Sequence, residues 1–280
     1  MKIQYLGTGA SEGIPGMFCA CNTCKMALML GGRNIMTRSQ MLVNDDLLID
    51  FNADTYLHFL KLGKTLSDIE YILITHSHTD HFTLEENFNR FDGMAYGIKA
   101  EKVKIYLSET AYKLMLQCTK IRGEDAESRK QRFEYITVEP FIPIKVGAYL
   151  VTPLPAVHMN SEQAFIYLIE KDKKTLFYGN DTGVFSEEID DYLKNNGKRI
   201  DFLSLDCTKC DNDFNYYTHM SMAEGRGIAD RFINKGVLKK NAKLFYTHFS
   251  HNGGQVYDDM VIRAKKYDFN VAYDGLIINL

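Results

Sequence analysis

Short apolar stretches, each ending in polar residues or a turn, recur along the whole chain of 280 residues. Their length and composition predict strands at 3–7, 70–75, 133–138, 148–152, 163–169, 174–179, 201–205 and 243–247, with a last strand pair near 270–279. Residues 40–50 predict a hairpin that turns at Asn44–Asp46. Helical spacing of apolar residues predicts helices at 54–62, 84–92, 109–120, 186–195, 219–234 and 254–266, with Asp54 as the N-cap of the first.

Strands dominate the first part of this pattern, and helices are interspersed with strands later. No Pro-, Gly- or Ser-rich linker divides the chain, so we expect residues 1–280 to form a single domain. Two sheets between helical layers fit such an order, although the pattern alone indicates only the α/β class. The densely charged stretch 121–132 is expected to be a solvated loop or helix on the surface.

Side chains of metal-ligating type follow several of the predicted strands. His76-Ser77-His78-Thr79-Asp80-His81 comes directly after the apolar run 71–74. Three further residues follow apolar runs in the same way: His158, Asp181 and His248. Open α/β sheets build their sites at the carboxyl ends of strands, and imidazole with carboxylate suits Zn²⁺, Mn²⁺ or Fe²⁺. The sequence therefore predicts a metal site at that edge.

A second metal is indicated by Cys19-Ala-Cys21-Asn-Thr-Cys24, in a loop at about 16–36. Thiolates at this spacing can hold one tetrahedral Zn²⁺, which leaves one coordination position for another ligand. The fourth ligand could be His58, His219, His251 or a cysteine of the pair Cys207 and Cys210. That pair can also be two unrelated thiols.

Composition indicates in which cellular compartment the protein acts and which classes of partner it is expected to bind. The net charge of −3 gives no basis for nucleic-acid binding driven by bulk charge, so a nucleic-acid partner is not expected. No apolar run reaches the roughly 18 residues that span a bilayer, and no signal-peptide core precedes the first strand, so we expect a cytoplasmic protein without membrane contact. Six cysteines in that compartment favour metal binding or inert thiols. The sequence leaves a homodimer open.

The pattern H-x-H-x-D-H at residues 76–81 resembles the ligand signature of the metallo-β-lactamase superfamily. This resemblance implies an αββα sandwich, with two mixed β-sheets between helical layers. Within the superfamily, the early C-x-C-x₂-C and the later Thr247-His248-Phe-Ser-His251 are similar to the phosphodiesterase family of the phosphonate-degrading carbon–phosphorus lyase pathway. Further matches extend over nearly the whole chain, at 7–9, 152–158, 181–183, 206–207 and 269–275.

The resemblance implies three bound metals. His76, His78 and His158 would bind one active-site metal, Asp80, His81 and His248 a second, and Asp181 would bridge both. These would be two divalent ions, Mn or Zn, that share a bridging hydroxide, the nucleophile. The implied ligands of a structural zinc are Cys19, Cys21, Cys24 and His251.

His219 is the implied substrate-binding and catalytic residue that is not a ligand, because related phosphodiesterases place a histidine there to contact phosphate or protonate the leaving oxygen. Asp80 is the other residue counted as catalytic, and Asp206 is expected to orient a ligand histidine. The segment around His219, Thr-His-Met-Ser, departs from the family's Asn-His-Cys-Asp, and 121–132 and 209–217 are longer than needed. These departures leave the substrate open. Arg33 and Arg38 could bind phosphate or serve the fold.

The expected function is therefore hydrolysis, by a metal-dependent phosphodiesterase, of a small and compact phosphodiester, cyclic in the leading case, such as phosphoribosyl 1,2-cyclic phosphate. Two alternatives remain. One is an oxidative enzyme that resembles the pyrroloquinoline quinone biosynthesis protein B family, which also has an early cysteine loop. The other is a tRNA 3′-processing nuclease, which needs a flexible arm or a basic platform.

Overall fold

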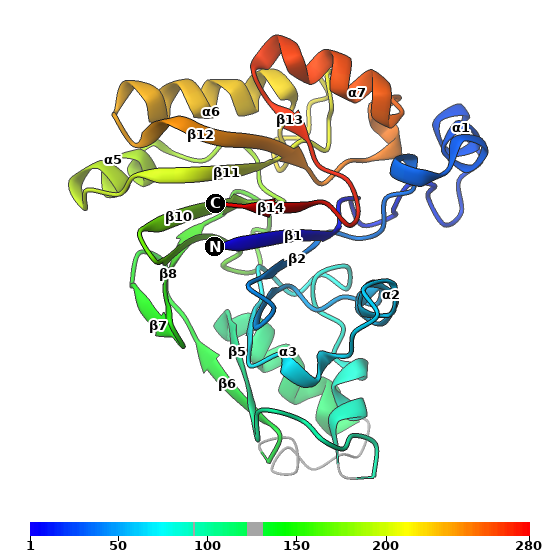
Figure 1. Cartoon of the computed structure of the whole chain (residues 1–280), viewed down its shortest axis with the longest axis vertical. Coiled ribbons are helices and arrows are strands. Elements are labelled where there is room, and N and C mark those ends of the chain that lie inside the picture. Colours follow the sequence, from blue (N-terminus) through cyan, green and yellow to red (C-terminus); the bar gives the residue numbers. More distant parts are fainter. Residues whose placement is uncertain (92, 122–130) are drawn as a thin grey trace.

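The computed structural model describes residues 1–91, 93–121 and 131–280. In these ranges, two seven-stranded sheets pack face to face, with helices on both outer sides (Figure 1). This is the αββα sandwich expected from the sequence. The charged stretch 121–132 lies mostly outside the described residues, at 122–130.

The first sheet is built from the N-terminal half of the chain and one strand from its end. Its spatial order is β14 (Ile277–Asn279), β1 (Lys2–Gly7), β2 (Gln40–Val43), β3 (Leu47–Ile49), β4 (Tyr71–Leu73), β5 (Val103–Leu107) and β6 (Phe133–Thr137). Strands β3 to β6 run parallel, and β1 is antiparallel to both of its neighbours.

The second sheet is built from the C-terminal half. Its order is β13 (Asn270–Val271), β12 (Leu238–Thr247), β11 (Ile200–Asp206), β10 (Lys174–Gly179), β9 (Phe165–Lys171), β8 (Tyr149–Pro155) and β7 (Ile144–Val146). Strands β10 to β13 run parallel, and β8 points the same way because both β8 and β10 are antiparallel to β9.

Helices cover the two outer faces (Figure 1). The first sheet carries α2 (Thr55–Lys61) and α3 (Glu109–Ile121), and the second carries α5 (Glu187–Asn195), α6 (Met222–Asn234) and α7 (Tyr257–Ala264). Helix α1 (Asn22–Leu30) stands apart at the right of Figure 1. Short 3-10 helices lie at Gly32–Asn34, Leu66–Asp68, Glu85–Arg90, His251–Gly253 and Lys265–Tyr267. In the described part of the chain, no helix is long and apolar enough to cross a membrane.

Alternation along the strands explains the four layers. Successive side chains of a strand point to opposite faces, so a strand that is apolar throughout has both of its faces buried. In β3, Leu47 and Ile49 join the core between the two sheets, while Leu48 joins the core under α2 and α3. A third core lies between the second sheet and its helices and contains Leu205 of β11 and Phe232 of α6. The apolar runs read from the sequence are thus strands covered on both sides.

Most predicted elements are present, with several corrections. The expected strand pair near 270–279 is wrong, because β13 pairs with β12 and β14 pairs with β1, in different sheets. The expected helix 84–92 is the short 3-10 helix Glu85–Arg90. Helix α6 begins at Met222 rather than 219, because Ser221 and Glu224 form a capping box there. Strands β5 and β7 and helix α1 were not predicted.

Asp54 occupies the N-cap position of α2, but its side chain makes no capping hydrogen bond. Its carboxylate instead accepts from the backbone N–H of Arg38 at 3.0 Å and from the Arg38 guanidinium at 3.0 Å. The Asp54 carboxylate therefore hydrogen-bonds to Arg38 instead of to the backbone N–H groups at the start of α2.

Candidate active site and metal centres

Parallel strands bring the predicted ligand residues to one edge of the sandwich. His158, Asp181 and His248 follow β8, β10 and β12, and Asp206 ends β11. The motif 76–81 follows β4 of the facing sheet. These segments line one cavity of about 610 Å³.

The first group of donors contains His76, His78, His158 and Asp181, whose ligand atoms all lie within 4.8 Å of one another. His78 Nδ1 is 2.8 Å from His76 Nε2 and 3.2 Å from His158 Nε2. His158 Nδ1 is 3.2 Å from Asp181 Oδ1. Nitrogens bound to one tetrahedral zinc at about 2.0–2.1 Å lie about 3.3 Å apart, so the spacing of these rings fits a shared ion.

The second group contains Asp80, His81, Asp181 and His248, again within 4.8 Å. Asp181 Oδ2 is 3.0 Å from His81 Nε2 and 3.6 Å from His248 Nε2, and His81 Nε2 is 3.1 Å from Asp80 Oδ2. Asp181 therefore belongs to both groups. It has a φ of 50°, in the left-handed region that Asp tolerates better than most residues.

Several inward atoms of the two groups have no other partner. His81 Nε2, His158 Nδ1, His248 Nε2 and Asp181 Oδ1 are buried and make no hydrogen bond of acceptable geometry in the described part of the chain. Buried polar atoms are nearly always satisfied in folded proteins, so four orphans at one point indicate a missing partner. A cation suits three imidazole nitrogens and a carboxylate oxygen, and the donor set fits divalent metal.

The electrostatics agree with a cation site. Burial opposes ionisation of Asp181, but the surrounding imidazoles, His248 first, hold its pKa well below the usual range. Burial, helped by the charge on His81, lowers the pKa of His76, so this ring has a free lone pair. Burial also opposes protonation of His81, but Asp80 and Asp50 outweigh it and raise the pKa. Positive charge is thus stabilised between the carboxylates.

His219 lies beside these groups, on the wall of the same cavity and just before α6. Its Nδ1 is 3.2 Å from both Asp206 Oδ2 and Asp181 Oδ1. Burial disfavours its protonation, but the Asp206 carboxylate outweighs burial and raises the pKa to about 9. Asp206 also approaches His248, with 3.3 Å between Oδ2 and Nδ1. The two histidines are thus held by one buried carboxylate.

The cysteine loop meets the end of β12. Cys19, Cys21, Cys24 and His251 have ligand atoms within 4.8 Å of one another. His251 Nδ1 is 3.7 Å from Cys19 Sγ and 3.6 Å from Cys21 Sγ. Sulfur and nitrogen on one tetrahedral zinc lie about 3.6 Å apart, so these distances fit such an ion. The backbone N–H of Cys24 lowers the pKa of Cys21 to about 6, which favours its thiolate.

The remaining candidates for the fourth zinc ligand lie elsewhere. His58 is buried, with its ring nitrogens 2.7 Å from Gln40 Oε1 and 2.7 Å from Thr37 Oγ1. Cys207 and Cys210 are fully buried in the core under the helices of the second sheet. Burial raises the pKa of Cys207 well above its ordinary value. These two cysteines are core thiols in the structure.

The two arginines weighed for phosphate binding are engaged by the protein itself. Arg33 lies over the rings of Tyr257 and Tyr273, at 5.5 and 4.2 Å from their centroids. Arg38 pairs with Asp54 and donates to Ser11 O at 3.0 Å.

The Gly7-Thr8-Gly9 segment passes close to the backbone of residues 36–38. A Cβ at Gly7 would lie 2.0 Å from Arg38 O, so only glycine fits there. The segment serves close packing next to the site.

A family comparison decides where this site belongs. Residues 46–249, which contain both donor groups, match the model of the beta-lactamase superfamily domain. The chain belongs to this superfamily. No functionally curated protein shows a significant sequence match to it.

Several solved structures share the fold of this chain. A diphosphatase from the PhnP family is 21% identical to it, with a TM-score of 0.75, and the match covers 100% of this chain and 97% of the other. Zn²⁺-bound PqqB from Methylobacterium extorquens shares 17% identity, with a TM-score of 0.70 and full coverage of both chains. The short form of human tRNase Z shares 16% identity, with a TM-score of 0.65 and coverage of 100% and 99%. At these identities, the likeness shows the fold.

Sequence reasoning missed two carboxylates in this superfamily member. Asp50 is fully buried at the end of β3, where its Oδ2 accepts from His81 Nδ1 at 2.8 Å and its Oδ1 accepts from the Thr75 backbone N–H at 2.8 Å. Glu162 accepts from the backbone N–H of Ser77 at 3.0 Å and so fixes the loop between His76 and His78. Asp50 carried a usable signal, since it follows an apolar strand as the ligands do. Glu162 lies in a loop and had none.

Proposed function

We propose that this protein is a metal-dependent phosphodiesterase that hydrolyses a small phosphodiester. The observation that carries the proposal is the pair of donor groups that share Asp181 on the wall of the 610 Å³ cavity. Two donor groups that share a carboxylate would hold two metals, and such a pair would suit in-line displacement at phosphorus. The likeness to a PhnP-family diphosphatase supports phosphorus chemistry.

In this proposal, His76, His78 and His158 hold one divalent metal, Asp80, His81 and His248 hold the second, and Asp181 belongs to both. The metals would be Mn²⁺ or Zn²⁺. When bound, they lower the pKa of water toward neutrality and neutralise charge on the phosphoryl oxygens.

The protein's own groups supply orientation and a proton. Asp50 and Asp206 face the Nδ1 atoms of His81 and His248, at 2.8 and 3.3 Å, which leaves each Nε2 free toward Asp181. His219 faces Asp206 through Nδ1, so its Nε2–H is available to the leaving oxygen. His219 is thus the proposed general acid and phosphate contact. Asp80 would contribute to catalysis as a ligand of the second metal.

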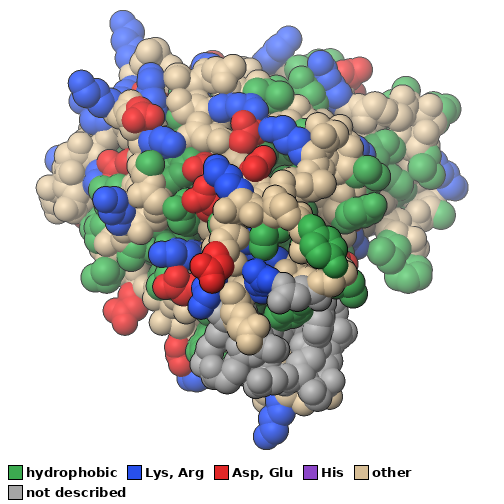
Figure 2. Space-filling model, turned by 60° about the horizontal axis from the view of Figure 1, so that its bottom comes forward, with side chains coloured by type: hydrophobic (Ala, Val, Ile, Leu, Met, Phe, Trp, Pro, Cys, Tyr) green, Lys and Arg blue, Asp and Glu red, His purple; other side chains and the backbone are tan. Residues whose placement is uncertain are grey.

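The size of the cavity favours a compact substrate. A volume of about 610 Å³ lies within the range of small-molecule sites, roughly 300–1,000 Å³. A cyclic diester such as phosphoribosyl 1,2-cyclic phosphate would fit this class. On the face in Figure 2, basic and acidic side chains of the described residues are mixed.

We also propose a structural zinc held by Cys19, Cys21, Cys24 and His251. Three thiolates and an imidazole would supply all four ligands of a structural zinc, with no position left for substrate. His248 and His251 are three residues apart, so this zinc would tie the loop at 16–36 to the active-site edge. Because one core is built from residues of both sheets, we propose that residues 1–280 act as one domain.

The test is hydrolysis of bis(p-nitrophenyl) phosphate by Mn²⁺- or Zn²⁺-loaded protein, followed by a panel of cyclic phosphodiesters, nucleotide diesters and lactones. We expect activity on diesters, and we expect His219→Gln to lower kcat while metal content stays at the wild-type value. His58→Gln is the matched control, since His58 lines no part of the catalytic cavity. Lack of diester cleavage by fully loaded protein would overturn the proposal. O₂ consumption with a single redox metal would replace it with an oxidative enzyme, and salt-sensitive tRNA binding with a nuclease.

A further inference from the structure

A second cavity lies apart from the catalytic one. Its volume is about 340 Å³, and its lining residues share none with the catalytic cavity. It is lined by Ile72 of β4, by the first residues of β5 and β6, and by the segment that contains the 3-10 helix Glu85–Arg90. It is large enough for a ligand of one or two rings.

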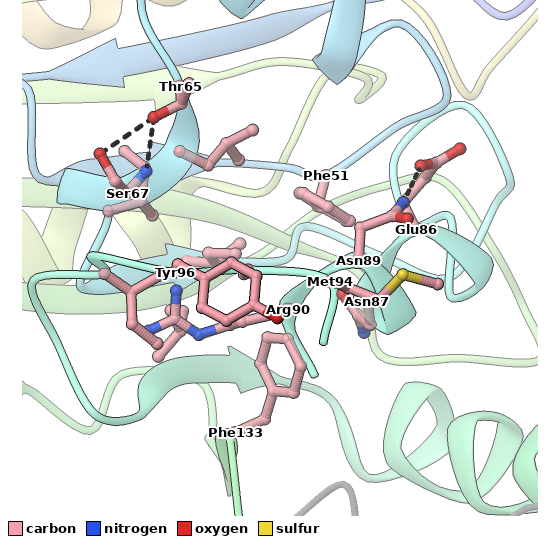
Figure 3. A pocket seen from close by; sticks show the side chains of 16 residues that line it. Phe51, Thr65, Ser67, Glu86, Asn87, Asn89, Arg90, Met94, Tyr96 and Phe133 are labelled. Atoms are coloured by element: carbon pink, nitrogen blue, oxygen red, sulfur yellow. Dashed lines mark hydrogen bonds between the residues drawn. The ribbon is translucent and has the colours of Figure 1, made fainter. Parts of the chain in front are cut away.

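The walls of this cavity are mainly apolar. They include Phe51, Ile69, Ile72, Val103 and Phe133. Met94 and Tyr96 are exposed in part, at 68% and 83%, so they stand at its opening. In Figure 3, the side chains of Arg90, Tyr96 and Phe133 gather on one side of the cavity, with Phe51, Asn87 and Met94 on the other.

Two polar groups of the lining lack partners. Asn87 is 1% exposed, and its Oδ1 is buried without a hydrogen-bond partner among the described residues. Arg90 Nε is also buried without such a partner, although its Nη2 donates to Ala100 O. Side chains at i and i+3 of a 3-10 helix eclipse one another, so Asn87 and Arg90 lie on the same face of Glu85–Arg90. An unpaired acceptor and an unpaired cationic donor therefore both border an apolar cavity.

Charge in the lining favours an anion at Arg90. Glu86 is the acidic side chain of the lining, and its Oε2 already accepts from Asn89 Nδ2 at 2.9 Å. Burial and the charge of nearby Arg132 both lower the pKa of Arg90, as expected for a guanidinium that would gain from an anionic partner. A carboxylate matches a guanidinium better than any neutral acceptor does.

We propose that this cavity binds a small aryl carboxylate that carries a hydrogen-bond donor on its ring. The ring lies against Phe51, Tyr96 and Phe133, the carboxylate accepts from Arg90 Nε, and the ring hydroxyl or amine donates to Asn87 Oδ1. Each unpaired group of the lining then has a partner, and the apolar walls have a planar body to pack against.

The cavity also touches the support of the active site. Phe51 is a wall residue, its backbone N–H donates to His81 O at 2.8 Å, and its carbonyl accepts from Thr83 N at 2.7 Å. Its neighbour Asp50 holds His81 Nδ1. A ligand that packs on Phe51 therefore lies next to the segment that positions His81.

The test is calorimetric titration of the full-length protein with the hydroxybenzoates and aminobenzoates, and with the matching benzamides as uncharged controls. We expect a benzoate to bind at one site per chain, with at least a tenfold preference over its benzamide. Arg90→Gln is expected to reduce benzoate affinity at least tenfold, while Arg199→Gln, an exposed arginine away from this cavity, keeps it.

Two further variants locate the site. Ala95→Phe fills the cavity from its lining and should abolish binding, and Tyr96→Ala at the exposed mouth should weaken it even if Ala95→Phe fails to fold. Benzamides that bind as tightly as benzoates would overturn the carboxylate assignment. Absence of binding by the whole panel, or benzoate binding that survives both Arg90→Gln and Tyr96→Ala, would overturn the site. Neither outcome depends on phosphodiester hydrolysis.

Discussion

Replacing Asp50 with Asn tests how the fold prepares His81 for metal. Asp50 is fully buried and has a φ of 66°, which Asn also tolerates, so the backbone should be preserved. Its Oδ1 accepts from Thr75 twice, from the backbone N–H at 2.8 Å and from Oγ1 at 2.9 Å. Its Oδ2 accepts from His81 Nδ1 at 2.8 Å.

In Asp50→Asn, the amide has one oxygen for these two sets of donors. Two hydrogen bonds from Thr75 hold that oxygen at the Oδ1 position, so the amide NH₂ faces His81 Nδ1. A donor at Nδ1 favours the tautomer with its proton on Nε2, the atom that faces Asp80 and Asp181. Loss of an orienting partner usually weakens metal binding 10- to 100-fold, and the wrong tautomer places this variant near 100-fold, about 2.7 kcal/mol.

The assay is a competition titration of the metal-free protein against a chromophoric chelator. We expect one active-site equivalent to weaken about 100-fold, while the His76, His78 and His158 equivalent and the cysteine-bound equivalent keep their affinities. Asp190→Asn is the matched control, because it neutralises another fully buried carboxylate, one that pairs with Arg231 at 2.7 Å far from the metal groups. A folded Asp50→Asn protein that binds all equivalents with wild-type affinity would refute the tautomer argument.

Three further predictions concern stability and metal content. Burial lowers the pKa of His58 from 6.5 to about 4, so between these pH values the unfolded chain binds a proton that the folded protein excludes. The free energy of unfolding should therefore fall by about 3 kcal/mol as the pH drops through this window, and the urea midpoint of His58→Gln should lack this part of the pH dependence. Cys19→Ser should lose one zinc equivalent, measured by elemental analysis, and unfold at a lower urea concentration. Cys118→Ser should keep its full zinc content, so equal zinc content in the two variants would contradict the cysteine site. Ser221→Ala should lower the free energy of unfolding by about 1 kcal/mol, measured by heat or urea, because Ser221 Oγ accepts from Glu224 N. Ser186→Ala, at an N-cap whose side chain makes no capping hydrogen bond, should lower it much less, and equal losses would refute the capping argument.

Local patterns were enough for most elements and for the ligand residue types. Apolar runs such as 47–49 and 166–169 are strands because both of their faces are covered, and a run of that kind is visible without the fold. The donors of the metal motif are adjacent in sequence, so their grouping needed no tertiary information. The cysteine triad was visible for the same reason.

Segments without such patterns were misjudged. Strands β13 and β14 are two and three residues long, and their partners lie in different sheets, so adjacency along the chain suggested a pair that does not form. At 219–221 the helical pattern extended past the start of α6, because the capping box at Ser221 fixes a boundary that periodicity cannot show.

The sequence by itself determined that this chain is an α/β protein with metal-ligating residues at strand ends and a thiolate loop near its start. The tertiary structure decided which of these meet: that Asp181 lies between two donor groups, that His251 rather than His58 or Cys210 faces the three cysteines, and that Asp50 stands behind His81. It also decided that Asn87 and Arg90 border a cavity. The reason is physical. Burial and the positions of the strands along the chain follow from local side-chain patterns, whereas contacts between residues tens or hundreds of positions apart depend on how two sheets pack against each other.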